Sequence, residues 1–122
     1  MAGNFKDLKR INSFLFSFGN EFLNVDGDRA AAYIAGGIKS KSVIFLTDVP
    51  GIMLDGELLT SLNVAKAREL MPKIGHGMEK KVLACVEALG MGVEEALIGS
   101  GLVENPISNV LRHNECTVIT NG

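Results

Sequence analysis

The sequence predicts an α/β fold, a three-layer sandwich in which a mainly parallel sheet lies between helices. The first observation is an uninterrupted apolar run, Val43-Ile44-Phe45-Leu46, bracketed by polar residues. Such a run is typical of a strand buried on both faces. The second is the alternation of further short apolar runs with helical patterns along the chain. The third is the presence of 14 glycines and no tryptophan, which favours tight loops over a helical bundle.

Bulk composition bounds the class of protein. A chain of 122 residues, 47% of them hydrophobic, suits one domain with one core. A net charge of −2 gives no support for binding to nucleic acid or to an acidic membrane. No apolar run approaches the roughly 20 residues of a membrane span, and the chain opens without a signal-peptide pattern. Cys85 and Cys116 stand far apart, outside any metal-ligand cluster, so we interpret them as small buried residues of a cytoplasmic protein.

The first 22 residues differ from the rest, because they hold five of the six phenylalanines. Helical spacing predicts a short helix over residues 5–12, and alternation of apolar and polar residues predicts a strand over residues 13–18. Gly19-Asn20-Glu21 is typical of a turn. We therefore treat residues 1–22 as an atypical N-terminal segment.

An alanine-rich helix is expected next, capped by Asp26 or Asp28 and ending near Gly36 or Ile38. A cap needs only one acid, so the second acid indicates polar groups that converge. The Asp-Gly-Asp spacing also resembles a calcium loop, but the remaining ligand positions of such a loop are missing.

The central strand is followed by a small β-flap and a helix. Pro50-Gly51 turns the chain, and Asp55-Gly56 between short apolar runs predicts a hairpin. Asn63 is then expected to cap a helix over residues 64–71, which Pro72 terminates.

A glycine loop, Gly75-His76-Gly77, precedes the next predicted helix, residues 78–89. The apolar residues of that helix fall on one stripe, namely Val82, Cys85, Val86 and Leu89. Lys80 and Lys81 lie in its first turn, where cations oppose the helix dipole. A phosphate bound by the glycine loop would explain these lysines; the alternative is a solvated lysine pair. His76 is either a general base or merely exposed.

The end of the chain predicts a strand, a helix and a strand. Residues 96–98 form a short apolar run, Asn105-Pro106 begins a helix over residues 106–111, and residues 116–120 form the last strand. His113 is interpreted as a surface residue after that helix. Ser100 lacks the spacing of a nucleophile elbow, which excludes that hydrolase pattern.

Thr47-Asp48 stands where the central strand ends. Open α/β sheets bind ligands at the carboxyl ends of their strands, so this pair is a candidate site. The alternative is a polar strand terminus followed by a turn.

Three motifs, in this order and spacing, resemble the amino acid kinase family: residues 23–28 (LNVDGD), residues 46–51 (LTDVPG) and residues 77–82 (GMEKKV). The resemblance is closest to the acetylglutamate kinase branch. Together with Asn105-Pro106-Ile107, the first motif is similar to archaeal-type enzymes that phosphorylate the side-chain carboxylate of aminoadipate or glutamate attached to an amino-group carrier protein. The resemblance covers most of residues 23–119.

The resemblance implies phosphoryl transfer from ATP, with a role for individual residues. Asn24 would bind the acyl-amino-acid substrate, Asp28 would orient the catalytic lysines, and Lys81 would stabilise charge on the transferred phosphoryl group. The residues that it implies beside the nucleotide are Thr47, Asp48, Val49, Pro50, Gly51, Ile52, Met53, Lys73, Ile74, Gly75 and Met78. Mg²⁺ would be held mainly through the nucleotide, so no residue is assigned as a metal ligand.

Departures from the family pattern limit what is expected of the chain. The family's glycine-rich phosphate turn, first catalytic lysine, Gly-Gly pair and substrate arginine have no counterpart in residues 1–22, and Cys116-Thr117 replaces the usual Gly-Thr. The resemblance therefore implies the C-terminal half of an amino acid kinase or carbamate kinase-like fold. Residues 23–122 would be its nucleotide-binding half, from a truncated or split enzyme, inactive or weak alone and forming a homo-oligomer. The alternative is a non-catalytic remnant that acts as a nucleotide-binding or interaction module.

Overall fold

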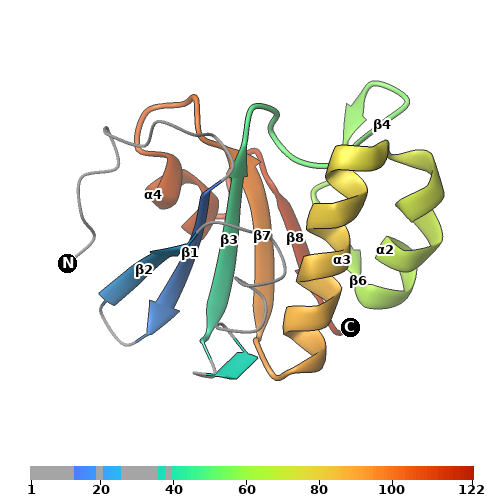
Figure 1. The fold of residues 1–122 in the computed structure, drawn as a ribbon. Coiled ribbons are helices and arrows are strands. Elements are labelled where there is room, and N and C mark those ends of the chain that lie inside the picture. The colour runs from blue at the N-terminus through green and yellow to red at the C-terminus, as the bar shows by residue number, and fades with distance from the viewer. Residues whose placement is uncertain (1–12, 19–20, 26–35, 38–39) are drawn as a thin grey trace.

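The computed structural model describes residues 13–18, 21–25, 36–37 and 40–122, the first two ranges by their backbone (Figure 1). Six strands of this part of the chain form one sheet in the order β2-β1-β3-β7-β8-β6. Their bounds are β1 Ser13–Phe18, β2 Glu21–Val25, β3 Ser42–Thr47, β6 Ser61–Asn63, β7 Glu95–Ser100 and β8 Thr117–Thr120. β4 (Met53–Leu54) and β5 (Glu57–Leu58) form a separate hairpin.

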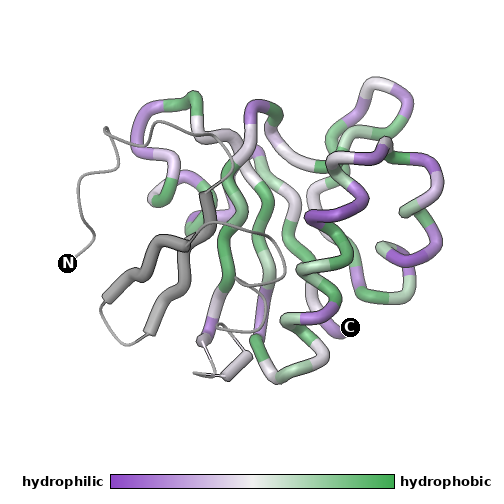
Figure 2. Tube along the Cα trace, viewed as in Figure 1, coloured by the Kyte–Doolittle hydropathy of each residue, from purple (hydrophilic) through white to green (hydrophobic). Residues whose placement is uncertain are grey.

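The sheet is mixed and has a parallel pair at its centre. β3 pairs in parallel with β7, and β6 pairs in parallel with β8. The pairs β1–β2, β1–β3 and β7–β8 are antiparallel. The predicted α/β class is confirmed, and its central strand is the predicted one: all six residues of β3 are buried. In Figure 2, hydrophobic residues run along β3 and β7, as expected of strands covered on both faces.

Helices cover both faces of the sheet, so the structure has three layers. Side chains alternate along a strand, and β3 divides accordingly. Val43 and Phe45 belong to a cluster with the inner faces of α2 (Val64–Leu70) and α3 (His76–Gly90). Ile44 and Leu46 belong to a second cluster with α4 (Pro106–Leu111). Burying each such side chain contributes about 1.5–3 kcal/mol of stability.

Local signals fixed several elements as predicted. β1 has the predicted bounds, and Asp55 and Gly56 make the hairpin turn with φ angles of 52° and 80°, as a type I′ turn requires. The Asn63 side chain caps α2 by accepting a hydrogen bond from the Lys66 N–H at 2.8 Å. α2 ends one residue earlier than expected, and Pro72 lies in the 3₁₀ turn η2 (Met71–Lys73) that follows.

Other predictions need correction. β2 and β6 were not predicted, and Glu21 begins β2 instead of completing a turn. His76 and Gly77 belong to α3, not to a loop, so Lys80 and Lys81 lie in its second turn. Asn105 precedes α4 as expected, but it is left-handed (φ 50°) and makes no side-chain cap.

Some predicted features lie outside the described residues. They are the helix over residues 5–12, the turn residues Gly19 and Asn20, and the alanine-rich segment with Asp26 and Asp28. At its end, Gly36 and Gly37 are helical.

Candidate functional site

The carboxyl ends of the central strands meet at one edge of the sheet. Thr47 of β3 is in register with Ser100 of β7. α3 leads into β7 and therefore runs against it, which brings the start of α3 to the same edge (Figure 1). β2 also runs toward this edge, because Val25 is in register with Phe14, and Phe14 with Phe45. Four segments from separate parts of the sequence thus converge where open α/β sheets bind ligands.

Thr47 and Asp48 form a fixed rim at this edge. The Thr47 hydroxyl, almost fully buried, donates a hydrogen bond to Oδ1 of Asp48 at 3.3 Å. The Thr47 carbonyl accepts a hydrogen bond from the Gly101 N–H at 2.8 Å, which ties the loop after β7 to the end of β3. Asp48 itself is exposed. Its carboxylate therefore accepts one hydrogen bond from the fold and remains accessible to a ligand.

The loop after Asp48 leads into the hairpin through alternating exposed and buried residues. Pro50 and Met53 are exposed, Val49 is half-buried, and Gly51 and Ile52 are buried. The Ile52 N–H donates a hydrogen bond to the Thr117 hydroxyl at 2.9 Å. Ile52 lies in the cluster on the α3 face, against which Ile74 and Met78 also pack. Ile52, Ile74 and Met78 thus belong to, or pack against, the same apolar cluster.

The start of α3 presents backbone donors at the edge. Gly75 is the residue before the helix, with a φ of 85° that favours glycine. It has no side chain to cap the helix, so the first-turn N–H groups face the edge and favour an anion there. Lys73, Gly75, His76 and Gly77 are exposed. The loop interpretation was wrong for His76 and Gly77. Backbone N–H donors are nevertheless present there, as the first turn of a helix.

Lys81 differs sharply from its neighbour Lys80. Lys81 has 7% of its surface exposed, whereas Lys80 is exposed. Lys81 shares the inner face of α3 with Cys85 and Ala88, because these residues follow at helical spacing. The predicted apolar stripe Val82, Cys85, Val86 and Leu89 is buried as expected. Lysine is almost never buried unless it is paired, so the burial of Lys81 sets it apart from Lys80.

The other predicted site residues are less fully defined. Asn24 lies in β2 in register with Leu15, two strands from β3. Asp28 lies outside the described residues. Within the described part of the chain, no group of three or more His, Cys, Asp and Glu side chains could hold a metal ion.

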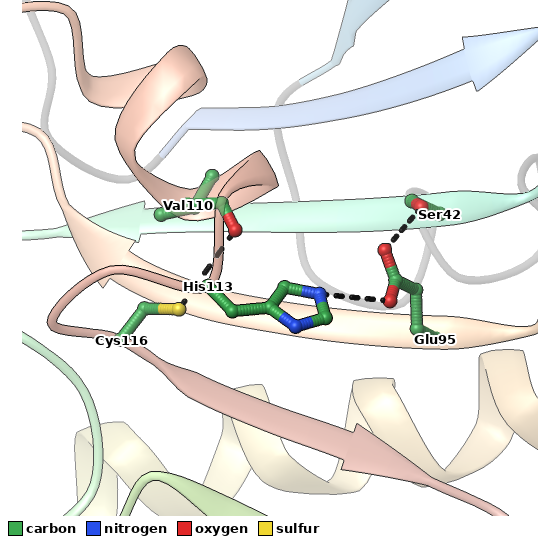
Figure 3. A network of polar contacts seen from close by, with 5 residues as sticks. All are labelled: Ser42, Glu95, Val110, His113 and Cys116. Carbon is green, nitrogen blue, oxygen red and sulfur yellow. Dashed lines mark hydrogen bonds and ion pairs between the residues drawn. The ribbon is translucent and has the colours of Figure 1, made fainter.

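A second polar cluster lies at the opposite, amino ends of β3 and β7 (Figure 3). Oε2 of Glu95 accepts a hydrogen bond from the Ser42 hydroxyl at 2.8 Å, and Oε1 lies 3.1 Å from Nε2 of His113. His113 is exposed, as predicted, but its contact with Glu95 was not foreseen. No local pattern could have signalled it, because the three residues come from three separate elements.

Cys116 and Cys85 are both buried free thiols, as predicted. The Sγ of Cys116 lies 3.9 Å from the Val110 carbonyl oxygen. Burial, and next the charge of Glu95, raise the pKa of the Cys116 thiol above its ordinary value of 9.0. The thiol is therefore neutral near pH 7 and is not an activated nucleophile.

The sequence profile of the amino acid kinase family matches residues 10–100. The chain belongs to the amino acid kinase family.

Within that family, two similar relatives have named functions. A putative LysW-aminoadipate/LysW-glutamate kinase of Cenarchaeum symbiosum is 57% identical over 108 residues, which are 87% of this chain and 41% of the relative. The LysW-aminoadipate/LysW-glutamate kinase of Sulfolobus acidocaldarius is 48% identical over 89 residues, 73% of this chain and 34% of the relative. The chain spans about two fifths or less of these relatives.

Solved structures share the fold. N-acetylglutamate synthase of Neisseria gonorrhoeae, complexed with coenzyme A and L-arginine, aligns with a TM-score of 0.74 and 26% identity, over 87% of this chain and 26% of that one. Carbamate kinase of Giardia lamblia, bound to AMP-PNP, aligns with a TM-score of 0.65 and 20% identity, over 87% and 36%. The expectation of a carbamate kinase-like fold is confirmed. No helix within the described residues is both long and apolar enough to span a membrane.

Proposed function

We propose that residues 23–122 form the nucleotide-binding half of a kinase that transfers phosphate from ATP to the side-chain carboxylate of a carrier-linked aminoadipate or glutamate, or of acetylglutamate. The observation that carries the proposal is Lys81, buried on the inner face of α3, the helix whose start lies at the sheet edge that Thr47-Asp48 forms. A buried cation near a helix N-terminus suits an anionic ligand. The names and identities of these two relatives support the choice of substrate class.

The residues of the edge fit the parts of a nucleotide. The start of α3, with Gly75 before it, would bind phosphate oxygens through backbone N–H groups. Apolar contacts from Ile52, Ile74 and Met78, together with residues 47–51, Met53 and Lys73, would form the walls of the site. Mg²⁺ would neutralise charge on the phosphates and be held mainly through them.

Catalysis of phosphoryl transfer depends mainly on the positioning of the reactants and on the stabilisation of charge. The ammonium of Lys81 stabilises the negative charge that develops on the transferred phosphoryl group. Asp28 orients the catalytic lysines, and Asn24 binds the acyl-amino-acid substrate. The first lysine and the substrate arginine of the family pattern have no counterpart here, so we expect several orders of magnitude less activity from this chain alone.

The test has two measurements on the full chain. Calorimetric titration with the magnesium complex of a non-hydrolysable ATP analogue should give saturable binding. A coupled assay for ADP with acetylglutamate should give little or no turnover, until an N-terminal half from such a kinase is added. Absence of nucleotide binding would overturn the proposal.

A second proposal is a non-catalytic module that binds nucleotide or a partner and forms a homo-oligomer. The outermost strands of the described sheet, β2 and β6, favour it, because strand edges offer unpaired backbone groups. Sedimentation measurements separate the two proposals. A stable monomer at high concentration that gains activity with an N-terminal half favours the kinase, and a stable oligomer that gains none favours the module.

A further inference from the structure

The hydroxyl of Thr117 bridges the two strands at the base of the β4–β5 hairpin. Thr117 is the first residue of β8 and is fully buried. Its Oγ1 accepts a hydrogen bond from the Ile52 N–H at 2.9 Å and donates one to the Leu59 carbonyl at 2.6 Å. The Leu59 N–H donates directly to the Ile52 carbonyl at 2.9 Å. One side chain thus contacts both strands of the hairpin, 65 and 58 positions away along the chain.

This bridge replaces one bond of the hairpin's own ladder. The hairpin pairs Met53 with Leu58 and Leu54 with Glu57, so Ile52 and Leu59 are the next pair outward. In an antiparallel ladder, alternate pairs exchange two N–H···O=C bonds. The Ile52–Leu59 pair makes one of these bonds directly and the other through the Thr117 hydroxyl, which can accept and donate at once. The hydroxyl therefore separates the strands and fastens them to β8.

The residue before Ile52, Gly51, packs closely against the same threonine. A Cβ at Gly51 would collide with Oγ1 of Thr117 and lie 3.0 Å from its backbone nitrogen. Gly51 is buried, whereas Pro50 before it and Met53 beyond Ile52 are exposed. Gly51 and Ile52 therefore both contact Thr117 in the core, and the residues that flank this pair, Pro50 and Met53, are exposed.

We propose that Thr117 is a positioning residue for the nucleotide site. Because its side chain is fully buried, it acts through Gly51 and Ile52, and it fixes the direction in which residues 49–53 leave the core. A loop held in its bound conformation loses less conformational entropy when the ligand binds. This inference rests on the proposed nucleotide site, and it adds a residue behind the site that controls its affinity.

Three variants separate the hydroxyl from the shape of the side chain. Thr117→Val keeps the shape and removes the bridge, leaving the buried Ile52 N–H and the partly buried Leu59 carbonyl without this partner. Thr117→Ser keeps the hydroxyl. Thr120→Val is the matched control, because Thr120 lies on the same strand and takes no part in the bridge.

The readouts are amide hydrogen exchange at Ile52 and Leu59 without ligand, and the dissociation constant of the magnesium complex of a non-hydrolysable ATP analogue. For Thr117→Val we expect faster exchange at both amides, unchanged exchange in β7 and α3, and affinity about tenfold weaker. Thr117→Ser and Thr120→Val should match the wild type.

The outcomes are distinguishable. A folded Thr117→Val protein that binds the analogue as the wild type does overturns the positioning role and leaves the proposed function standing. A wild type that does not bind the analogue overturns both, and the exchange data then show only a structural bridge. If Thr117→Val does not fold, the wild type and Thr117→Ser decide. The Ile52 amide must be protected in both and both must bind alike; an unprotected amide, or tenfold weaker binding by the serine variant, overturns the proposal.

Discussion

The two ends of β3 and β7 carry polar groups that are arranged in opposite ways. At the amino ends, Glu95 contacts both the Ser42 hydroxyl and the His113 ring. At the carboxyl ends, Asp48 is held by Thr47 but remains exposed, and α3 begins after a glycine that has no side chain to cap it. Lys81 is buried on the inner face of the same helix.

This difference indicates that the amino ends of β3 and β7 serve stability and that their carboxyl ends serve ligand binding. Polar groups that are hydrogen-bonded to one another stabilise the fold and have less capacity to bind a ligand. Polar groups that are positioned but accessible contribute less to the fold and are suited to binding. We therefore expect substitutions at the amino ends to lower the free energy of unfolding, and substitutions at the carboxyl ends to weaken nucleotide binding.

The largest effect is expected at Lys81. Lys81→Met keeps the aliphatic stem and removes the charge, so the dissociation constant of the magnesium complex of the ATP analogue should rise by about 10- to 100-fold. Calorimetric titration measures it. Lys80→Met is the matched control, because Lys80 is the exposed neighbour on the same helix. Equal effects of the two substitutions on the dissociation constant would contradict the assignment of Lys81 to the nucleotide site.

The amino-end cluster should show the opposite pattern. Glu95→Ala removes the acceptor of the Ser42 hydroxyl and the partner of His113, so we expect a loss of about 1–2 kcal/mol in the free energy of unfolding. Urea denaturation measures it, and nucleotide affinity should not change. The control Glu94→Ala replaces an exposed neighbour and should change stability by less than about 0.5 kcal/mol. A weaker nucleotide affinity in Glu95→Ala would contradict the proposal that the amino ends of the strands serve stability and the carboxyl ends serve binding.

The smallest effect concerns pH and Cys116. Its pKa is raised in the folded state by burial and by Glu95, so the folded chain keeps the thiol proton at a pH where the unfolded chain loses it. Its contribution is therefore fully present below pH 9.0 and is lost as the pH rises through the higher folded-state pKa. Urea denaturation at pH 8 and pH 10 should show a smaller loss of stability in Cys116→Ala than in the wild type. Equal losses would contradict the raised pKa.

Sequence reasoning succeeded where the signal is local. The apolar run of β3, the Asp55-Gly56 turn and the Asn63 cap each depend on neighbouring residues, and each has the predicted structure. β6 was missed because pairing with the distant strand β8 defines it, and β2 was missed because its first residue, Glu21, was interpreted as part of a turn. Ser61-Leu62-Asn63 contributes only one buried side chain. The start of α3 was misplaced because Gly75-His76-Gly77 has the composition of a loop. Only Gly75 has a positive φ, and the helix begins at the next residue.

The candidate site divides in the same way. Thr47, Asp48 and Lys81 could be proposed from motifs, because each motif is a short contiguous stretch. Thr117 could not, because its role depends on partners in the hairpin that only the fold brings to it. The burial that distinguishes Lys81 from Lys80 is likewise a property of the packed helix and not of the sequence around it.

The central claim is that the carboxyl ends of β3 and β7, and not their amino ends, bind a nucleotide. The most direct measurement is the change in backbone amide NMR shifts when the full chain is titrated with the magnesium complex of a non-hydrolysable ATP analogue. We predict saturable changes at residues 47–53 and 75–81, and none at Ser42, Glu95 and His113. The absence of changes at saturating analogue, or changes confined to the amino-end cluster, would contradict the claim.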